Sequence, residues 1–316
     1  MSITTAAIGE KKGVTRKAAL VVAALSVGYL LLSYLLVGFK SDQLVLVGLA
    51  NLLYFASAVT RKFITGFSIF IVFWVLYDYM KAFPNYWFNP VHIQDLYEAE
   101  KAVFGIRDGA AVLTPNEFWL QQSNSFLDVM SGFFYLTWIP VPLAFAAFLF
   151  FWNRRQFVYF SLTFLLVNLL GFVVYYLYPA APPWYVQLHG FDFIAATPGN
   201  TAELAKFDAF FNVTIFNSLY AKGSNVFAAM PSLHSAYPLI VFYYALRNNL
   251  GVVAKVFFGI ITAGIWFAAV YTSHHYVLDV LAGIACASFG IWLFHWLLAR
   301  KGTCHQAVEK LVQAIR

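Results

Sequence analysis

The chain has 316 residues, of which 61% are hydrophobic, 20% are aromatic and only 11% are charged. A soluble domain carries about 45–50% apolar and about 25% charged residues, so this chain has too few charges to cover a water-exposed surface. Together with a mean hydropathy of +0.71, this composition predicts an integral membrane protein. It excludes a secreted domain, a cytosolic enzyme and a disordered protein, and it argues against a nucleic-acid partner despite the net charge of +6.

Eight segments are predicted to span the membrane, because a spanning helix needs about 20 mostly apolar residues to cross a hydrocarbon core of about 30 Å. The first is too long for the core of a signal peptide and is interpreted as a retained helix. The sixth is the shortest. The sequence thus predicts an all-α, multi-pass membrane protein with about eight transmembrane helices. In chain order, the segments are 18–39, 43–60, 63–83, 129–152, 156–178, 233–247, 252–273 and 277–299.

Basic residues predict the orientation, because cytoplasmic loops carry an excess of Lys and Arg. With the N-terminus in the cytoplasm, 14 of the 20 Lys and Arg residues fall on the cytoplasmic side. Both termini are therefore predicted to be cytoplasmic. The apolar residues of the tail 305–316 predict a helix that lies in the membrane interface or docks on the protein, and the interfacial helix is favoured. The 14 residues are Lys11, Lys12, Arg16, Lys17, Arg61, Lys62, Arg154, Arg155, Arg247, Lys255, Arg300, Lys301, Lys310 and Arg316.

Two long loops, 84–128 and 179–232, lie on the non-cytoplasmic side in this topology. The first has apolar residues at helical spacing from Ile93 to Phe104, which predicts an amphipathic helix in the membrane interface. The second is broken by prolines and rich in Trp and Phe, so it is too aromatic for a solvated linker. Loops of this length are usually functional or disordered, and the aromatic content favours a folded cap over the bilayer surface.

Histidines gather at one membrane face. His234 opens the sixth span, and His274 and His275 lie between the seventh and eighth spans. Asp279 follows His275 by four residues, so the two side chains share one face of a helix. A carboxylate there can accept a hydrogen bond from one ring nitrogen, which leaves the other nitrogen as a nucleophile or base. An Asp inside an apolar span is itself a functional candidate.

Two further features favour phosphoryl transfer. His234 can donate and accept a proton near neutral pH. Ser232 lies near the N-cap of the sixth helix, after Pro231, where free backbone N–H groups form an anion site. Nucleophile, acid–base group and anion site together predict transfer through a phosphohistidine.

Other interpretations stay open at this point. A metal site is one, because His234, His274, His275 and Asp279 are all possible ligands. Against it, side chains at adjacent positions of a helix diverge, so no metal and no cofactor are expected. A transporter or scaffold is another, and it predicts two similar halves or charges at mid-bilayer, neither of which is evident.

At these residues the sequence resembles the type 2 phosphatidic acid phosphatase superfamily. That family carries a Pro-Ser-x-His motif and a later His-x-x-x-Asp motif, matched here by Pro231–His234 and His275–Asp279. The resemblance implies that His275 is the nucleophile, Asp279 orients it and His234 protonates the leaving group. It also implies a six-helix catalytic core over 62–300, preceded by a two-helix segment, 1–61, and followed by a cytoplasmic tail, 301–316.

The sequence departs from the phosphatase branch of this family. The Lys and Arg-Pro of the first family motif are absent, and Ala268 and Ala269 replace the Ser-Arg pair that precedes the nucleophile. Instead the chain resembles the inositol phosphorylceramide synthase branch. The matching residues include Glu100, Phe104-Gly105, Pro182-Pro183-Trp184-Tyr185, Pro198-Gly199, Asp208, Ala229–Ser235, His274-His275-Tyr276, Asp279 and Gly283.

This branch implies more substrate-binding residues. Pro183, Trp184, His274 and Tyr276 belong to its matching stretches and are expected at the substrate site, together with Ser232. As the non-cytoplasmic cation nearest to His234 in sequence, Lys222 is expected to contact phosphate.

The expected activity is a phosphotransferase that moves inositol phosphate from phosphatidylinositol to the hydroxyl of a ceramide-like lipid. A phosphodiester carries one negative charge, so it needs fewer cations than the dianionic monoester that a phosphatase binds. The acceptor lipid must also outcompete water, which a covered site favours. A lipid phosphate phosphatase that uses the same residues is the alternative. The site is expected on the periplasmic or lumenal face, and the sequence identifies no protein partner.

Overall fold

The computed structural model describes residues 14–223 and 225–316, which are helical apart from one short hairpin and the connecting loops. Lys11 and Lys12, which the predicted topology places in the cytoplasm, lie outside the described residues. The long helices are α1 (Arg16–Val37), α2 (Ser41–Ala56), α3 (Ala58–Tyr79), α6 (Ser125–Leu136), α7 (Pro140–Trp152), α8 (Arg154–Leu177), α12 (Leu233–Arg247), α13 (Val252–Tyr271), α14 (Val277–Ala299) and α15 (Thr303–Ile315).

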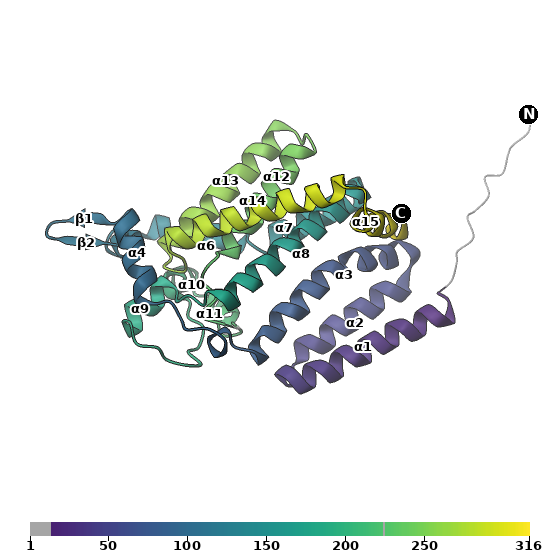
Figure 1. Cartoon of the computed structure of the whole chain (residues 1–316), viewed down its shortest axis with the longest axis horizontal. Coiled ribbons are helices and arrows are strands. Elements are labelled where there is room, and N and C mark those ends of the chain that lie inside the picture. The colour runs from purple at the N-terminus through teal and green to yellow at the C-terminus, as the bar shows by residue number, and fades with distance from the viewer. Residues whose placement is uncertain (1–13, 224) are drawn as a thin grey trace, which may run out of the picture.

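Shorter elements cluster at one end of the bundle (Figure 1). The two strands pair antiparallel, with Arg107 opposite Val112. These elements are the 3₁₀ helices η1 (Met80–Ala82), η2 (Asn85–Trp87) and η3 (Ala202–Leu204), the strands β1 (Ile106–Asp108) and β2 (Ala111–Leu113), and the helices α4 (Gln94–Phe104), α5 (Pro115–Gln121), α9 (Pro183–His189), α10 (Ala205–Phe211) and α11 (Ile215–Tyr220).

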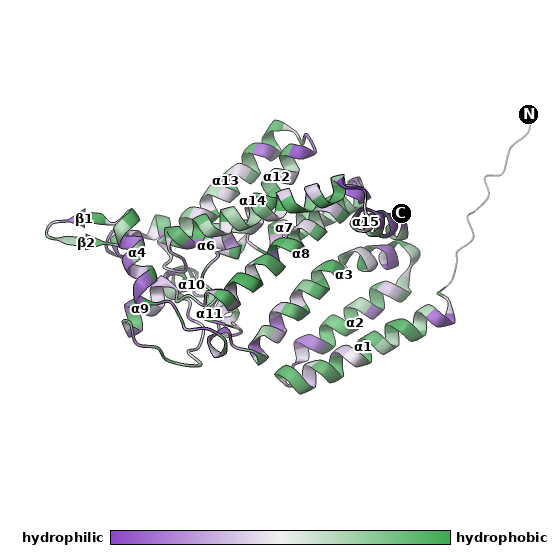
Figure 2. Cartoon of the chain, in the orientation of Figure 1, coloured by the Kyte–Doolittle hydropathy of each residue, from purple (hydrophilic) through white to green (hydrophobic). Residues whose placement is uncertain are grey.

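Six stretches of the described chain are long and apolar enough to cross a membrane: α1, α3 with η1, α6 with α7, α8, α13 and α14. Figure 2 shows apolar residues along these helices. The chain is therefore an all-α, multi-pass integral membrane protein. The predicted spans 43–60 and 233–247 form helices α2 and α12, which have only 16 and 15 residues, so the full count of eight stays a prediction.

Helix α8 is the centre of the bundle, in contact with α3, α7, α12 and α14. Within its most apolar stretch 61% of the residues are buried, against 6% in α1. Buried aromatic rings from α7, α8 and α12 form the largest core cluster, which includes Phe150, Phe160 and Tyr244. Helices α1 and α2 pack beside α3 at the edge of this bundle (Figure 1).

The C-terminal helix α15 packs on the protein. Val308, Val312 and Ile315 are buried in the main core cluster, and the helix contacts α3 and α8. The Arg154 guanidinium donates a hydrogen bond to the Ile315 carbonyl at 2.6 Å. The tail thus forms a helix whose apolar face covers the bundle, which is the docking alternative and not the favoured interfacial one.

Helix α4 confirms the helix predicted after residue 93. Leu96 is buried in a cluster with Ala180, Ala229 and Tyr276, which come from three distant segments. Part of the apolar face of α4 therefore packs over the start of α14, while Val103 of the same predicted face is exposed. That this helix lies in the membrane interface stays a prediction.

The aromatic loop 179–232 forms the predicted folded cap. Phe207 and Phe216 are buried against Tyr135 of α6 and against the last turns of α13. Trp184 and Tyr185 pack with Phe227 in a separate cluster. The burial of these rings holds the cap on the bundle, because burying a large aromatic side chain stabilises a fold by about 1.5–3 kcal/mol.

Two glycines let the motif-bearing helices approach closely. A Cβ on Gly283 of α14 would lie 2.1 Å from the Ser232 carbonyl oxygen, and one on Gly171 of α8 would lie 2.8 Å from a Leu233 methyl group. Backbone cannot yield as a flexible side chain can, so Gly283 fixes the distance between α14 and the start of α12.

We expect Gly283→Ala to be destabilising, because the new methyl group meets the Ser232 backbone. Overpacking of this kind costs about 1–3 kcal/mol. Thermal unfolding of the purified variant in detergent should show a clearly lower midpoint, with lost turnover. Gly251→Ala is the matched control, since a Cβ there meets nothing within 4 Å. Equal midpoints for the two variants would contradict this role of Gly283.

Candidate active site

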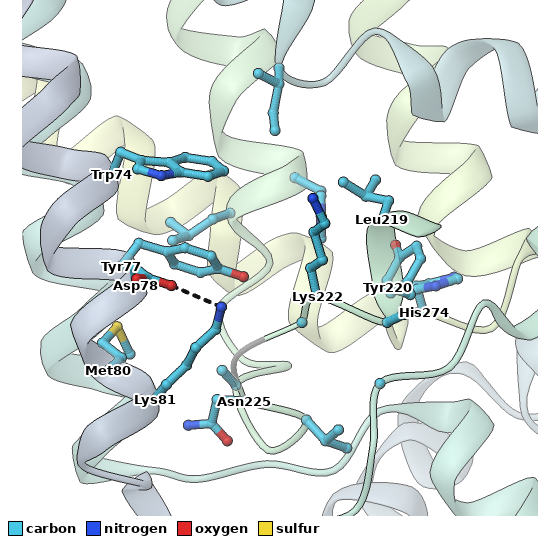
Figure 3. Close-up of a pocket in the computed structure, with 18 of the residues that line it drawn as sticks. Trp74, Tyr77, Asp78, Met80, Lys81, Leu219, Tyr220, Lys222, Asn225 and His274 are labelled. Atoms are coloured by element: carbon cyan, nitrogen blue, oxygen red, sulfur yellow. Dashed lines mark hydrogen bonds and ion pairs between the residues drawn. The ribbon is translucent and has the colours of Figure 1, made fainter. Parts of the chain in front are cut away.

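A cavity of about 700 Å³ lies beside the start of α12. His234, His274 and His275 line one wall. Figure 3 shows it between α3, which carries Trp74 and Tyr77, and the segment from Leu219 to Lys222, with His274 beyond that segment. The three histidines that the sequence placed at one membrane face thus share one cavity.

The start of α12 is tied to the first turn of α14. Ser232 is the N-cap of α12, as predicted, and its Oγ accepts a hydrogen bond from the Ser235 N–H at 3.3 Å. The Ser232 N–H donates to the Asp279 carbonyl at 2.9 Å. This backbone bond fixes His234 and Asp279, which lie 45 positions apart in sequence, in one local unit.

The two histidines of the motifs are in direct contact. His234 Nδ1 and His275 Nε2 form a hydrogen bond of 2.9 Å. On the other side of the His275 ring, Nδ1 lies 3.6 Å from Asp279 Oδ2. Asp279 Oδ2 accepts a hydrogen bond from the Tyr276 N–H at 2.8 Å, which holds the carboxylate in place. The order His234–His275–Asp279 is therefore a line of three groups.

Nδ1 of His275 is buried without a hydrogen-bond partner among the described residues, and the Asp279 carboxylate lies 3.6 Å from it. In the tautomer that carries its proton on Nδ1, the lone pair of Nε2 faces His234 Nδ1. Burial lowers the pKa of His275 to about 4, against a smaller opposing effect of the Ala229 carbonyl. The ring is therefore neutral at pH 7, so Nε2 is a competent nucleophile.

His274 turns away from its neighbour, as expected for adjacent positions. Its Nδ1 lies 3.0 Å from the Thr272 carbonyl oxygen, and its ring packs 4.6 Å from that of Tyr220 and 5.2 Å from that of Tyr135. Its Nε2 is buried without a hydrogen-bond partner among the described residues. Across the described residues, no group of three His, Cys, Asp or Glu side chains is placed to hold a metal ion.

The other expected substrate-binding residues lie in three different places. Trp184 and Lys222 line the histidine cavity. Pro183 and Tyr276 instead line a separate small cavity of about 60 Å³, and Ser232 is fully buried. The prediction that all of them border one substrate site therefore does not match the geometry: Ser232 supports the site through its helix cap.

Glu100 acts on this site from outside the cavity. It is fully buried, and its two carboxylate oxygens accept hydrogen bonds from the N–H groups of Val277 and Leu278 at 2.9 and 3.0 Å. These are free donors at the start of α14, where a negative charge is favoured. The sequence identified Glu100 only through its family resemblance. Its spacing of four from Leu96, on the apolar face of α4, was the signal that it is buried.

Asn116 is a second supporting residue that sequence reasoning missed. Its Nδ2 donates to the Val270 carbonyl at 2.7 Å and to the His275 carbonyl at 2.9 Å. It thereby fixes the backbone of the loop that carries the nucleophile candidate. Only the three-dimensional fold reveals this contact, since 159 residues separate Asn116 from His275.

Charged residues line the cavity away from the histidines. The Lys222 amine lies 3.1 Å from the Asp42 carboxylate. Asp78 pairs with Lys81 at 2.9 Å and with Lys40 at 3.7 Å. Sequence reasoning selected only Lys222, because the others lie in or near the first three spans, outside the matched motifs.

Comparison with protein families places this fold and site. Residues 109–293 match the PAP2 superfamily, and the chain belongs to that superfamily. No solved structure matched the chain.

Among curated proteins, the chain is similar to a phosphoinositol dihydroceramide synthase of Bacteroides thetaiotaomicron. The two are 43% identical over 281 residues, which cover 89% of this chain and 92% of that protein. It is also similar to inositol phosphorylceramide synthase catalytic subunits of Schizosaccharomyces pombe and Saccharomyces cerevisiae. These are 25% and 27% identical over 76% and 67% of this chain, which cover 56% and 52% of the fungal proteins. The chain thus matches about half the length of each fungal relative.

Glu100→Gln should weaken the start of α14 and lower kcat by about tenfold or more, the effect of losing a hydrogen bond to a charged group. Burial raises the pKa of Glu100 to about 7, with the two N–H donors opposing the shift. The ionised carboxylate prevails only above that pH. Wild-type kcat should therefore fall as the pH drops through 7, and the variant should lack this transition.

The measurement is a pair of pH–rate profiles between pH 5 and 9. Glu98→Gln, on the same helix but exposed, is the matched control and should keep the wild-type profile. A transition near pH 7 that persists in Glu100→Gln would show that another group causes it.

Proposed function

We propose that this chain is a membrane phosphotransferase that moves inositol phosphate from phosphatidylinositol to the hydroxyl of a ceramide-like lipid. The observation that carries the proposal is the line His234–His275–Asp279, whose two histidines line a cavity, in a chain 43% identical to a phosphoinositol dihydroceramide synthase. Diacylglycerol is the other product.

In the first step, His275 Nε2 attacks the phosphorus of the donor. A P–N bond forms and the P–O bond to the diacylglycerol oxygen breaks. The hydrogen bond from His234 Nδ1 points at the attacking lone pair. His234 takes part in this step as the imidazolium: once phosphorus occupies that position, its Nδ1 proton passes to the leaving oxygen and the ring becomes neutral. Asp279 stabilises the positive charge that the His275 ring gains.

In the second step, the acceptor hydroxyl attacks the phosphohistidine. His234 takes the hydroxyl proton, a P–O bond forms and the P–N bond breaks, which returns both rings to their starting states. Water is the competing acceptor. Aromatic side chains that line the cavity favour the lipid over water, because they reduce solvent at the reacting group. They are Tyr29, Trp74, Tyr77, Trp138, Tyr175, Trp184, Tyr220 and Tyr237.

The proposal includes a topology. The site lies at the end of the bundle that carries the cap, and α15 lies at the other end (Figure 1). With the basic residues on the cytoplasmic side, the termini are cytoplasmic and the cavity faces the periplasm or lumen. We further propose three parts: a two-helix segment over 1–61, a catalytic core over 62–300 and a tail over 301–316, in line with the peripheral packing of α1 and α2.

His275→Ala should abolish transfer, because no other ring nitrogen of residues 14–223 and 225–316 is placed between His234 and Asp279. The test supplies head-group-labelled phosphatidylinositol, with and without ceramide, to purified protein in detergent, and separates the products by chromatography. The wild type should form an inositol phospholipid and diacylglycerol only with ceramide present. Full turnover by a folded His275→Ala protein would overturn the mechanism, and phosphate release from phosphatidic acid instead of transfer would favour the phosphatase.

The loss of rate caused by His234→Ala should depend on the leaving group of the donor. With phosphatidylinositol, loss of the proton donor should lower the rate of the first step about 10²–10⁴-fold. With p-nitrophenyl inositol phosphate, whose leaving group needs no proton, the loss should be much smaller. Stopped-flow release of nitrophenolate measures this step. Equal losses with both donors would exclude His234 as the acid, and His275→Ala should fail with both.

A further inference from the structure

The charged end of the cavity is formed by three separate parts of the chain. Lys40 comes from the turn between α1 and α2 and Asp42 from the first turn of α2. Asp78 and Lys81 come from the end of α3 and from η1, and Lys222 comes from the cap. All five line the cavity that holds His234 and His275. Figure 3 shows Lys81 and Lys222 extending into the space between α3 and the cap. We call these five residues the charged rim.

The segment that supplies Lys40 and Asp42 is held in a fixed shape. Gln43 is buried, and its side chain accepts a hydrogen bond from the Lys40 N–H at 3.2 Å and donates one to the Gly38 carbonyl at 3.0 Å. The Ser33 hydroxyl bonds to that of Tyr79 at 2.9 Å, which ties α1 to α3. The rim is therefore positioned by buried contacts before any ligand arrives.

Stabilisation of the fold does not explain why these charged residues are gathered in the rim. The side chains of Lys222 and Asp42 are 70% and 61% exposed, and an ion pair this exposed contributes little to stability. Such a pair exchanges partners readily. Asp78 and Lys81, at 17% and 24% exposure, form a more enclosed inner pair. The rim thus offers both donors and acceptors that a ligand can take over.

The chemistry of the rim selects the class of ligand. Three lysines and two aspartates among the described lining residues leave a net charge of +1, which balances the single negative charge of a phosphodiester. Each hydroxyl of a polyol both donates and accepts hydrogen bonds, so it can bind carboxylates and ammonium groups together. A dianionic phosphate or a cationic head group would suit this mixture less well.

We propose that the charged rim is the specificity site for the polyol head group of the donor lipid, and that the start of α2 belongs to it through Lys40 and Asp42. This inference rests on the proposed function and deepens it. The two-helix segment then has a role in substrate choice: it brings one side of the head-group site to the histidines.

The test compares donor kinetics in detergent micelles for wild type, Asp42→Asn, Lys222→Gln and Lys81→Gln. We expect KM for phosphatidylinositol to rise about tenfold or more, as for the loss of a hydrogen bond to a charged group, while kcat changes by less than about threefold. Lys255→Gln, near the opposite end of α13 from the site, is the matched control and should keep the wild-type KM. Unchanged KM in all three rim variants would overturn the proposal.

A charge swap separates recognition from simple pairing. Asp42→Lys combined with Lys222→Asp restores an ion pair between the two positions but exchanges their charges. A rim that contacts the head group should keep the raised KM in this double variant. Recovery of the wild-type KM would show that the pair only fastens the cap to the start of α2, and would contradict the proposal.

Calorimetry can measure the binding of glycerophosphoinositol to the wild-type protein without any catalysis, so it tests this inference separately from the proposed function. Binding that Lys222→Gln and Asp42→Asn both weaken supports the rim even if no lipid product forms. The opposite result is also informative. If the wild type transfers from phosphatidylinositol but the rim variants bind glycerophosphoinositol as tightly as the wild type does, the proposed function stands and the head-group role of the charged rim is overturned.

Discussion

One backbone hydrogen bond, from the Ser232 N–H to the Asp279 carbonyl, sets the geometry of the active-site candidate. It joins the cap of α12 to the first turn of α14, and Gly283 gives the two backbones room to meet. Because His234 and Asp279 are carried by the joined segments, His275 lies between them without a long-range salt bridge. Glu100 and Asn116 then secure the backbone on either side of that ring.

The sequence was sufficient for the parts of this protein that depend on local pattern. Apolar length predicted the long helices, and proline with serine predicted the N-cap at Ser232. The i, i+4 spacing predicted that the side chains of His275 and Asp279 lie on the same face. The structure brings them together, although His275 Nδ1 and Asp279 Oδ2 are 3.6 Å apart, which is too long for a hydrogen bond. These features follow from the chain's own periodicity, which is why they needed no tertiary information.

What the sequence missed depends on contacts between distant segments. The interfacial helix was favoured over docking for the tail because a hydrophobic stripe has the same pattern whether lipid or protein covers it, and α15 docks on the bundle. Glu100 reaches α14 across 177 positions, and Lys222 meets Asp42 across 180. No spacing rule reports such pairings, so the supporting residues and the charged rim emerged only from the fold.

The length of α2 has a consequence for the lipid environment. In the eight-span topology its 16 residues rise only about 24 Å, whereas the hydrocarbon core is about 30 Å thick. The bilayer must thin around this helix, or the helix must sit deeper, each at a modest cost per ångström of mismatch. Lys40 and Asp42 lie at the N-terminal end of α2. Bilayer thickness therefore affects the depth of these two residues in the membrane relative to the histidines. If the charged rim binds the head group, the acyl-chain length of the surrounding membrane is thereby linked to the enzyme's affinity for its donor lipid.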